Sequence, residues 1–450
     1  MRTNVLDLLQ STGPVTAPEA CRRLGVSQPT FSRLIRANAE RILRVGQARA
    51  TRYAARRHVG GVEAPVPVYE IGAPGSPVRQ VATVHPVEPA GFLIESQDAT
   101  TREFLPDLPW YLQDLRPSGF LGRLVPRRHP DLDVPPDVRL WTADHVLRYV
   151  TRRAWDLPGA FVLGDRALEE FLAHVERPGN VVAAEERVGR YPAIAEALLA
   201  FGDPGSSAAG EQPKFLATRA DGDRLTPVLV KFSPPALDAP ARRIADLLVA
   251  EHLALAVLSE QGFESPRSEV LNAGGRTFLE VERFDRFGAA HRRGVVSLQA
   301  LDAGLLGSDQ SSWTHAVEAL ATRRVVPVEA VERVRWVELF ARLVGNTDRH
   351  FGNLGFLLDG LKVATLAPAY DMLPMHYHPR QGELPAEPYR LPVIGPREAG
   401  VAPGAVDAAA RFWRAVAADG RVSEGFRRIA EADAERLRGL SGEAGSGLNT

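Results

Sequence analysis

Apolar residues recur at helical spacing in one stretch of the second half of the chain, Glu329–Val344. The positions on this apolar face are Val331, Val334, Val337, Leu339, Phe340 and Leu343. They predict a buried helix that runs directly into the polar segment Gly345–Asn353. The pattern then changes to two short apolar runs joined by Asp359-Gly360, which predicts a β-hairpin. Because a hairpin returns the chain close to its start, we expect Asp371, after the second run, to lie beside Asn353.

Upstream of this region, alternating and helical patterns predict a mixed domain. The expected elements are a helix over Ala184–Phe201, strands over Phe215–Thr218 and Thr226–Phe232, a helix over Ala241–Gln261, strands over Glu269–Asn272 and Thr277–Val281, and a mostly helical region over 297–345. Strands followed by a long helical region indicate an α+β fold.

Residues 1–58 follow the pattern of a winged helix-turn-helix domain. The apolar run Val5–Leu9 predicts a first helix, and Thr16–Glu19 is a capping box that opens a second. Ser27 caps a third helix, whose inward face includes Phe31. A hairpin wing follows, with strands over Arg41–Val45 and Arg49–Ala54 joined by a turn at Gly46-Gln-Ala48. The outward residues that we expect to contact DNA are Gln28, Thr30, Arg33 and Arg36 on the third helix, with Arg49 and Arg52 on the wing.

The next region is less regular. Residues 59–68 have the composition of a linker. Residues 68–140 are rich in Pro and Gly, with short β-like runs at Val78–Val84 and Gly91–Ile94, and we interpret them as an accessory β subdomain. The segments 141–153 and 166–176 are typical of helices.

Charge is unevenly distributed along the chain. The net charge is −1, but residues 1–58 carry eleven arginines against three acidic residues, so this head is near +8 and the rest near −9. A basic head on an acidic body favours contact with nucleic acid. The alternative is a small protein-docking domain with a solvated basic face.

Length and composition narrow the class of protein. A chain of 450 residues predicts two to four domains. The single Cys21 excludes a disulfide framework and a multi-cysteine metal site, which fits a reducing compartment. No stretch of 18 apolar residues and no signal-like opening are present, so we expect a cytoplasmic protein.

Lysine is rare in this sequence. Of 54 basic residues only Lys214, Lys231 and Lys362 are lysines. A compact ammonium differs in shape and hydration from a planar guanidinium, so the surviving lysines indicate positions where that difference matters. Chance survival is the alternative. Lys214 and Lys231 fall in a segment whose pattern indicates a nucleotide site.

The candidate catalytic residues lie in and after Gly345–Asn353. Asp348 and Asn353 have the D-x-x-x-x-N spacing of a protein-kinase catalytic loop. In that chemistry the Asp accepts a hydroxyl proton and the Asn oxygen holds a magnesium ion. Asp371 would supply a second metal-binding carboxylate. The alternative is a polar loop followed by an ordinary turn residue.

A candidate phosphate-binding region precedes this loop. Gly202–Lys214 consists mostly of small residues, which let backbone N–H groups approach phosphate oxygens, although it is not a Walker A motif and a flexible connector would look alike. Lys231 ends an apolar strand, as the phosphate-contacting lysine of kinases does. Glu251 on the next helix is the candidate partner of Lys231, with Asp246 and Glu260 as alternatives.

A candidate hinge follows the last of these strands. Glu282–Phe284 stands where a strand would leave one lobe for the next, and its backbone groups would there meet an adenine edge. An ordinary strand end with an ion pair is an equally good interpretation of these residues.

Six motifs in order carry a family resemblance: Leu121-Gly122, Gly210-Glu-Gln-Pro-Lys214, Val230-Lys231, Val281-Glu-Arg-Phe-Asp285, Asn346-Thr-Asp-Arg-His-Phe-Gly-Asn353 and Leu366-Ala-Pro-Ala-Tyr-Asp371. With them the chain resembles, over roughly residues 68–440, the HipA-like serine/threonine kinases, toxins of bacterial toxin–antitoxin systems. The resemblance implies a bilobal protein-kinase-like α+β fold. Its parts would be the accessory subdomain (68–140), an N-lobe (141–296) and a helical C-lobe (297–440).

The resemblance also implies roles for single residues. Asp348 would be the catalytic base, Asn353 and Asp371 the magnesium ligands, and Lys231 a contact of the ATP phosphates. The implied nucleotide contacts are Ala209, Gly210, Glu211, Gln212, Pro213, Lys214, Lys231, Glu282, Arg283, Phe284, His350, Phe351, Gly352, Asn353, Tyr370 and Asp371. Family members switch themselves off by phosphorylating a serine just upstream of the phosphate loop, in register Ser207 or else Ser206.

The implied partners follow from the same likeness. Family targets are typically translation factors such as aminoacyl-tRNA synthetases, whereas a fused DNA-binding head, found in a less common branch, also fits a DNA-associated target. DNA bound through residues 1–58, an antitoxin and a second copy of the chain are further expected partners. Two rival functions remain open: a transcription regulator that senses nucleotide without transferring phosphate, and a small-molecule phosphotransferase.

Overall fold

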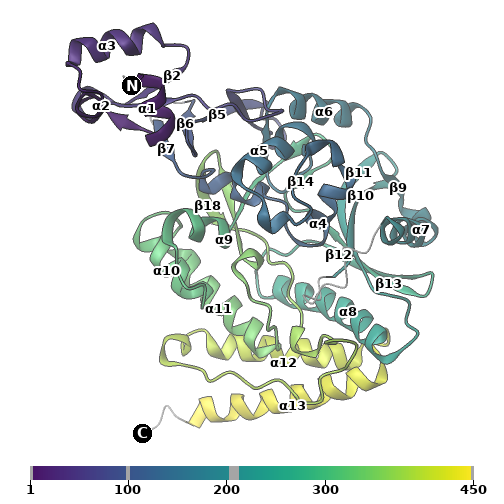
Figure 1. Ribbon diagram of the computed structural model, residues 1–450. Helices are drawn as coiled ribbons and strands as arrows, with labels where there is room; N and C mark the ends of the chain where they lie inside the picture. Colours follow the sequence, from purple (N-terminus) through teal and green to yellow (C-terminus); the bar gives the residue numbers. More distant parts are fainter. Residues whose placement is uncertain (1–3, 98–101, 202–211, 447–450) are drawn as a thin grey trace. The chain divides into compact units, whose positions relative to one another are not determined.

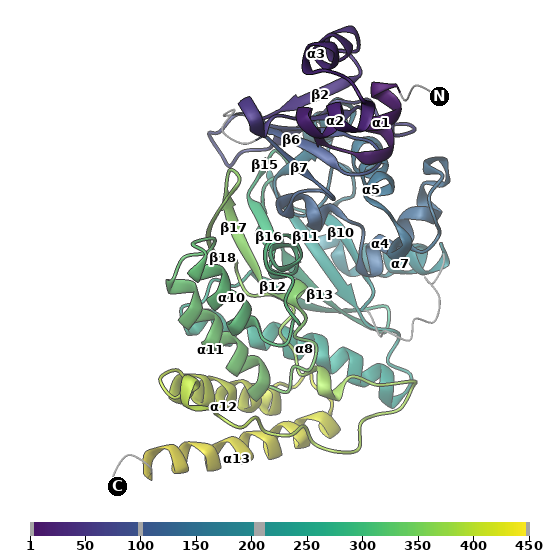
Figure 2. The same ribbon diagram turned by 60° about the vertical axis from the view of Figure 1, so that its left-hand side comes forward.

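The computed structural model describes residues 4–97, 102–201 and 212–446, and the chain divides into two units (Figures 1 and 2). Unit 1 consists of Met1–Pro117 and Val125–Glu176, and unit 2 of Ser118–Leu124 and Arg177–Thr450. Among the described helices, none combines the length and the apolar character needed to cross a membrane.

The head of unit 1 has the elements expected of a winged helix-turn-helix. They are α1 (Val5–Thr12), β1 (Val15–Thr16), α2 (Ala17–Leu24), α3 (Gln28–Ala37), β2 (Ile42–Val45) and β3 (Arg52–Ala55), with the strands in the order β1-β3-β2. The Thr16 hydroxyl accepts the Glu19 N–H at the start of α2, and Gly25 ends this helix at a left-handed φ of 65°. The second wing strand begins three residues later than its pattern indicates, because Ala48–Ala50 form a 3₁₀ turn.

The wing has two buried faces. Ile42 and Ala55 pack with the helices of the head. Leu43, Val45 and Ala54 pack instead against residues of the accessory sheet, among them Val87 and Leu93. In both views β2 lies between α3 and the accessory strands (Figures 1 and 2). The head is therefore joined to the accessory sheet by a shared apolar core.

The segment 59–68 is not a free linker, contrary to its composition. Val59 and Val62 are only 3% and 6% exposed, and the next strand already begins at Val66. Arg57, just before it, donates to the backbone oxygen of Val87 at 2.9 Å and forms an ion pair with Asp144. Between the two valines, the Gly60 backbone oxygen accepts a hydrogen bond from Arg148 at 2.9 Å, a long-range contact that composition alone does not reveal.

The accessory sheet contains five antiparallel strands in the order β7-β6-β5-β4-β8. The strands are β4 (Val66–Glu70), β5 (Arg79–Pro86), β6 (Phe92–Ser96), β7 (Arg102–Leu105) and β8 (Phe161–Leu163), accompanied by α5 (Ala143–Arg152) and α6 (Asp165–Glu176). Because β8 pairs with β4, residues up to Glu176 pack in unit 1, and the expected boundary at 140 falls inside this unit. Among the helices and strands of the described residues, only α4 (Gly119–Arg128) is divided between the two units.

The first half of unit 2 is a five-stranded sheet in the order β12-β13-β11-β10-β9. Its strands are β9 (Val181–Ala183), β10 (Lys214–Asp221), β11 (Arg224–Phe232), β12 (Ser268–Ala273) and β13 (Arg276–Glu282). Side chains of α7 (Arg187–Ala200) and Phe120 pack on one face, around Phe215 and Phe278. The other face meets α8 (Ala239–Glu260), through Leu248 against Leu279.

The second half of unit 2 is mostly helical. It contains α9 (Leu298–Leu301), α10 (Trp313–Thr322), α11 (Glu329–Leu343), α12 (Ala402–Ala418) and α13 (Glu424–Ser446), and the strands β14 (Arg286–Phe287), β15 (His291–Arg292), β16 (Gly294–Ser297), β17 (Gly355–Asp359) and β18 (Lys362–Leu366). The yellow helices α12 and α13 lie side by side, and α12 contacts both α11 and α8 (Figure 1). The predicted hairpin forms as β17 and β18, with Asp359 opposite Lys362. This hairpin and α11 hold the two ends of the candidate catalytic loop.

Candidate active site

Three charged side chains from distant parts of unit 2 meet at the centre of the site. The Lys231 ammonium on β11 donates to both carboxylate oxygens of Glu251 on α8, at 2.7 and 2.8 Å. It also donates to the Asp371 carboxylate at 2.5 Å. Of the three acidic residues on α8 that the sequence offered as partners, geometry selects Glu251. Asp246 instead accepts the N–H and hydroxyl of Ser423.

The two carboxylates bind the ammonium in different surroundings. Burial alone would lower the pKa of Lys231, but Asp371 and Glu251 raise it well above its usual value. Burial opposes ionisation of Asp371 as well, yet the nearby Lys231 and Lys214 hold its pKa well below the usual range. Burial raises the pKa of Glu251, and Lys231 offsets this only in part. Lys231 and Asp371 are therefore charged at neutral pH, and Glu251 is the member that protonates most readily.

Lys214 lies directly opposite Lys231 in the antiparallel pair β10–β11. The segment before it is fixed to the same strand: Gln212 donates to the Phe232 carbonyl, and Phe232 N–H donates to the Pro213 carbonyl at 3.0 Å. Two of the chain's three lysines thus occupy paired positions at the site, whereas Lys362 is exposed on the hairpin. The rest of the expected phosphate loop, Ala209, Gly210 and Glu211, lies outside the described residues, as do Ser206 and Ser207.

The candidate catalytic loop, Gly345–Asn353, is held by a bond between its own residues and by one from α10. The Asn353 amide donates to the Asp348 backbone oxygen at 2.9 Å, which joins the two ends of the D-x-x-x-x-N segment. Trp313 on α10 donates to the His350 backbone oxygen at 3.3 Å. The Asp348 side chain is exposed, and its carboxylate accepts no hydrogen bond from any described residue. This carboxylate is available to an incoming hydroxyl.

The hairpin brings the segment before Asp371 back to the loop, as predicted. Tyr370 donates its hydroxyl proton to the Gly352 backbone oxygen at 2.8 Å. Its ring stacks on Phe284 of the expected hinge, with ring centroids 5.9 Å apart. Asp371 has a positive φ of 55°, a conformation that non-glycine residues adopt rarely and at a cost. Contacts on both sides of Asp371 must therefore hold it in place.

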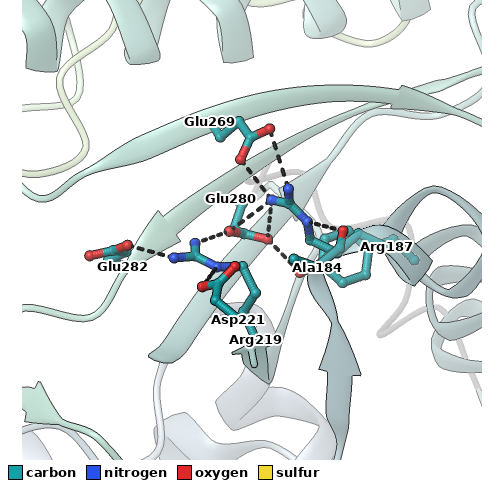
Figure 3. Close-up of polar contacts among 8 residues, drawn as sticks. Ala184, Arg187, Arg219, Asp221, Glu269, Glu280 and Glu282 are labelled. Atoms are coloured by element: carbon teal, nitrogen blue, oxygen red, sulfur yellow. Dashed lines mark hydrogen bonds and ion pairs between the residues drawn. The ribbon is translucent and has the colours of Figure 1, made fainter. Parts of the chain in front are cut away.

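In the sheet β12-β13-β11-β10-β9, the face opposite to the one that carries Lys231 holds a cluster of charges around the buried Glu280 (Figure 3). Arg187 at the start of α7 and Arg219 on β10 both donate to the Glu280 carboxylate, at 3.2 and 2.6 Å. Arg219 also binds the carboxylate of Glu282, the first hinge residue, at 2.9 Å. The Glu282 side chain is thus engaged by Arg219, and its backbone is what the hinge can offer to a nucleotide base.

The other residues proposed from the sequence differ in how they are placed. His350 is exposed, and its charge lowers the pKa of Asp371, although less than the lysines do, so it lies near the site. Phe351 is only 1% exposed, so its side chain belongs to the core rather than to a nucleotide surface. Arg283 forms an ion pair with Asp285 at 3.0 Å.

On the head, the outward positions of α3 are open to solvent. Gln28, Arg33 and Arg36 are exposed, Thr30 is half-buried, and Arg52 on the wing is exposed. The side chain of Arg49 lies outside the described part of the structure. The described residues of this face, Thr30 apart, are therefore exposed.

Asn346 is the residue that the sequence interpretation missed. It is 1% exposed, and its amide bonds both the Asp348 N–H and the Asp371 backbone oxygen. A signal was present, since Asn346 opens the motif that includes Asp348. Its contact with Asp371, 25 residues away, could not be read from that motif.

A cavity of about 380 Å³ adjoins the catalytic loop. Its walls include Phe263, Arg333 and Trp313 in addition to Asn353 and Tyr370. Lys231, Lys214 and Asp371 do not line it. The charges that would receive phosphates thus lie outside this cavity.

Comparison with known proteins places the chain in a family. A family model of the HipA-like C-terminal domain matches residues 206–435, and a model of the middle domain of YjjJ-like toxins matches residues 62–172. The chain belongs to the HipA-like toxin family, which confirms the resemblance. Toxin YjjJ of Escherichia coli (strain K12) is 36% identical to it over 441 residues, 97% of each chain.

A solved structure agrees with the fold. HipA of Shewanella oneidensis MR-1, from a complex with HipB and its operator DNA, superposes with a TM-score of 0.53 at 15% identity, over 84% of this chain and 99% of that one. This likeness confirms the α+β kinase-like fold. At 15% identity this likeness shows the fold alone.

Proposed function

We propose that this chain is a cytoplasmic, Mg-ATP-dependent serine/threonine protein kinase of the HipA type that also binds DNA through residues 1–58. One observation carries the proposal: Lys231, Glu251 and Asp371 converge in the unit where Asn353 ties the two ends of the Asp348 loop. A strand lysine, a helical glutamate, a base and two metal-binding side chains are the parts that phosphoryl transfer to a hydroxyl requires.

The residues present fit magnesium better than a tightly bound structural metal. No group of three His, Cys, Asp or Glu side chains gathers into a metal site among the described residues. Asn353 and Asp371 offer one amide oxygen and one carboxylate, both hard ligands. Magnesium is commonly held by one or two carboxylates together with substrate phosphates and water. When bound, Mg²⁺ would neutralise charge on the phosphates.

Each side chain of the site has a role in this proposal. Lys231, oriented by Glu251, binds phosphate oxygens, and Lys214 adds a second positive charge beside it. The backbone of Glu282–Phe284 contacts the base. The free Asp348 carboxylate accepts the proton of the serine or threonine hydroxyl and orients that hydroxyl for attack.

The partners are proposed from the same family context. The target is a protein, either an aminoacyl-tRNA synthetase or a DNA-associated protein. The solved HipA was obtained with an antitoxin and operator DNA, which supports an antitoxin and DNA as partners of this chain. We further propose Ser207 as the site of autophosphorylation and a homodimer as the assembly.

The test uses the full chain with [γ-³²P]ATP and Mg²⁺, and follows label transferred to the chain itself. Asp348→Asn should lower the rate by roughly 10²–10⁴-fold, the usual contribution of a positioned base. Asp359→Asn, at the exposed hairpin turn, is the matched control and should leave the rate unchanged. Equal rates for Asp348→Asn and wild type would remove Asp348 from its role.

Mass spectrometry of the same incubation separates the rival functions. Phosphate on Ser207 supports a self-inactivating kinase. Bound nucleotide without any transferred phosphate would instead favour a nucleotide-sensing regulator. Label that reaches only a small molecule in a substrate screen would favour a small-molecule phosphotransferase.

A further inference from the structure

Asn346 connects the two segments that carry the proposed catalytic groups. Its Oδ1 accepts the backbone N–H of Asp348 at 2.9 Å. Its Nδ2 donates to the backbone oxygen of Asp371 at 3.4 Å and approaches the Met372 sulfur at 3.7 Å. One buried amide thus bonds the loop of the base and the loop of the metal carboxylate at once.

The backbone of Asn346 is itself fixed, so its side chain is a firm support. Its N–H donates to the Ala341 oxygen at 2.9 Å, and its carbonyl accepts from Arg349. Gly345 before it has a φ of 73° and lies against the Tyr389 ring, which a Cβ atom would approach to 3.1 Å. Asn346 therefore begins the loop from the rigid end of α11.

The backbone of Asp371 has an unusual conformation that needs such a support. A positive φ at a non-glycine residue is unfavourable, and it persists only when neighbours hold it. Asn346 holds the Asp371 carbonyl, and Lys231 holds its carboxylate. When nucleotide phosphates engage Lys231, the Asn346 bond still restrains the Asp371 backbone.

We propose that Asn346 is a positioning residue that sets the magnesium affinity of the site by fixing the Asp371 backbone. This inference rests on the proposed kinase function. Loss of the amide leaves the Asp371 backbone free to relax to an ordinary φ, which turns the carboxylate away from its ligand position. The loss should weaken Mg²⁺ binding more than it lowers the rate at saturating Mg²⁺, because the Asp348 carboxylate is not itself held by Asn346.

The test titrates Mg²⁺ against full-length chains with two readouts: the rate of ATP phosphoryl transfer, and the binding of a non-hydrolysable ATP analogue measured by isothermal titration calorimetry. Asn346→Leu keeps the approximate size of the side chain and removes both hydrogen bonds. We expect the half-saturating Mg²⁺ concentration to rise roughly tenfold, the effect of losing one good hydrogen bond. The rate at saturating Mg²⁺ should fall less than this half-saturation point rises.

Tyr389→Phe is the matched control, because the Tyr389 hydroxyl donates to the Leu343 oxygen beneath the same loop but touches neither Asp348 nor Asp371. It should lower the melting temperature and leave the Mg²⁺ half-saturation point unchanged, so the titration separates positioning from support of the fold. Should Asn346→Leu fail to fold, Asn346→Ser carries the same measurement.

The outcomes separate the two proposals. If wild type transfers no phosphate from Mg-ATP, the kinase function is wrong and this inference falls with it. If wild type is active and the Asn346 variant keeps the wild-type Mg²⁺ half-saturation point, the kinase function stands and the positioning role is overturned. The same holds if Tyr389→Phe shifts the half-saturation point as much as the Asn346 variant does.

Discussion

Replacing Lys231 by methionine removes the ammonium that is hydrogen-bonded to both Glu251 and Asp371. The Glu251 side chain is 3% exposed, so it is left as a buried charge without its hydrogen-bonded partner. Removing one member of a buried ion pair costs about 3–5 kcal/mol. The Asp371 side chain is 32% exposed, so water screens it and its share is small. We expect the total to be near the lower value, ~3 kcal/mol.

For a unit of this size, such a loss lowers the melting temperature by roughly 6–12 °C. Differential scanning calorimetry of the full chain measures it, on the transition that reports unit 2. Lys362→Met is the matched control, because Lys362 is exposed on β18 and should give the wild-type melting temperature.

The pH dependence of this loss follows from the pKa of Glu251. Burial already raises it, and removing the ammonium raises it further. A carboxyl group whose folded pKa lies above its unfolded value contributes stability at low pH, and this contribution is lost as pH rises through the folded pKa. The gap between Lys231→Met and wild type should therefore be smaller at pH 5.5 than at pH 8.

A second substitution isolates the cause. Adding Glu251→Gln to Lys231→Met removes the unpaired charge, so stability at pH 8 should partly return and the extra pH dependence should vanish. A Lys231→Met protein within ~1 kcal/mol of wild type at pH 8, the range of a surface ion pair, would refute the reasoning. So would a double variant no more stable than the single one.

Two further predictions concern the head. Arg36→Ala in the full chain should weaken binding to a mixed-sequence DNA duplex and reduce the slope of log affinity against log salt by about one. Arg79→Ala on the accessory sheet is the control and should change neither. Fluorescence anisotropy across a salt series measures both, and an unchanged slope for Arg36→Ala would favour the protein-docking interpretation. Arg57→Ala should speed hydrogen exchange in β2 and β3 roughly tenfold, since it loses an ion pair and a buried hydrogen bond. Exchange as slow as in wild type, or equally fast in the exposed Arg44→Ala control, would show that Arg57 does not hold the wing.

Local patterns gave most of the elements and the candidate catalytic set. The helix before Gly345, the Asp359-Gly360 turn and the spacing of Asp348 and Asn353 are short-range features, and the structure has the helix and the turn where they were predicted. Because a hairpin returns the chain close to its start, it also predicted that Asp371 comes back toward the loop that ends at Asn353. The roles assigned to these residues stay predictions until activity is measured.

Long-range contacts are what the sequence could not supply. The pairing of β8 with β4 joins residues more than ninety positions apart, so the boundary at 140 was misplaced. The bond from Asn346 to Asp371 and the burial of Glu280 between Arg187 and Arg219 depend on strands and helices meeting in space. These contacts join residues that are too far apart in the sequence for a helical or alternating pattern to relate them.

The wing offered a signal that composition obscured. Ile42, Leu43 and Val45 are buried, and a strand with consecutive apolar residues is typical of one covered on both sides. Likewise, the Gly and Pro content of residues 59–68 did not exclude the burial of Val59 and Val62.

The doubly covered wing limits how this protein can be recombined. A head taken from another winged-helix protein would bring a hydrophilic outer wing, and Val87 and Leu93 would then face water. Grafts that test the proposed DNA binding should therefore retain Leu43, Val45 and Ala54 and replace only the exposed positions of α3. The part of this molecule that can be exchanged is one helix surface, not the whole head.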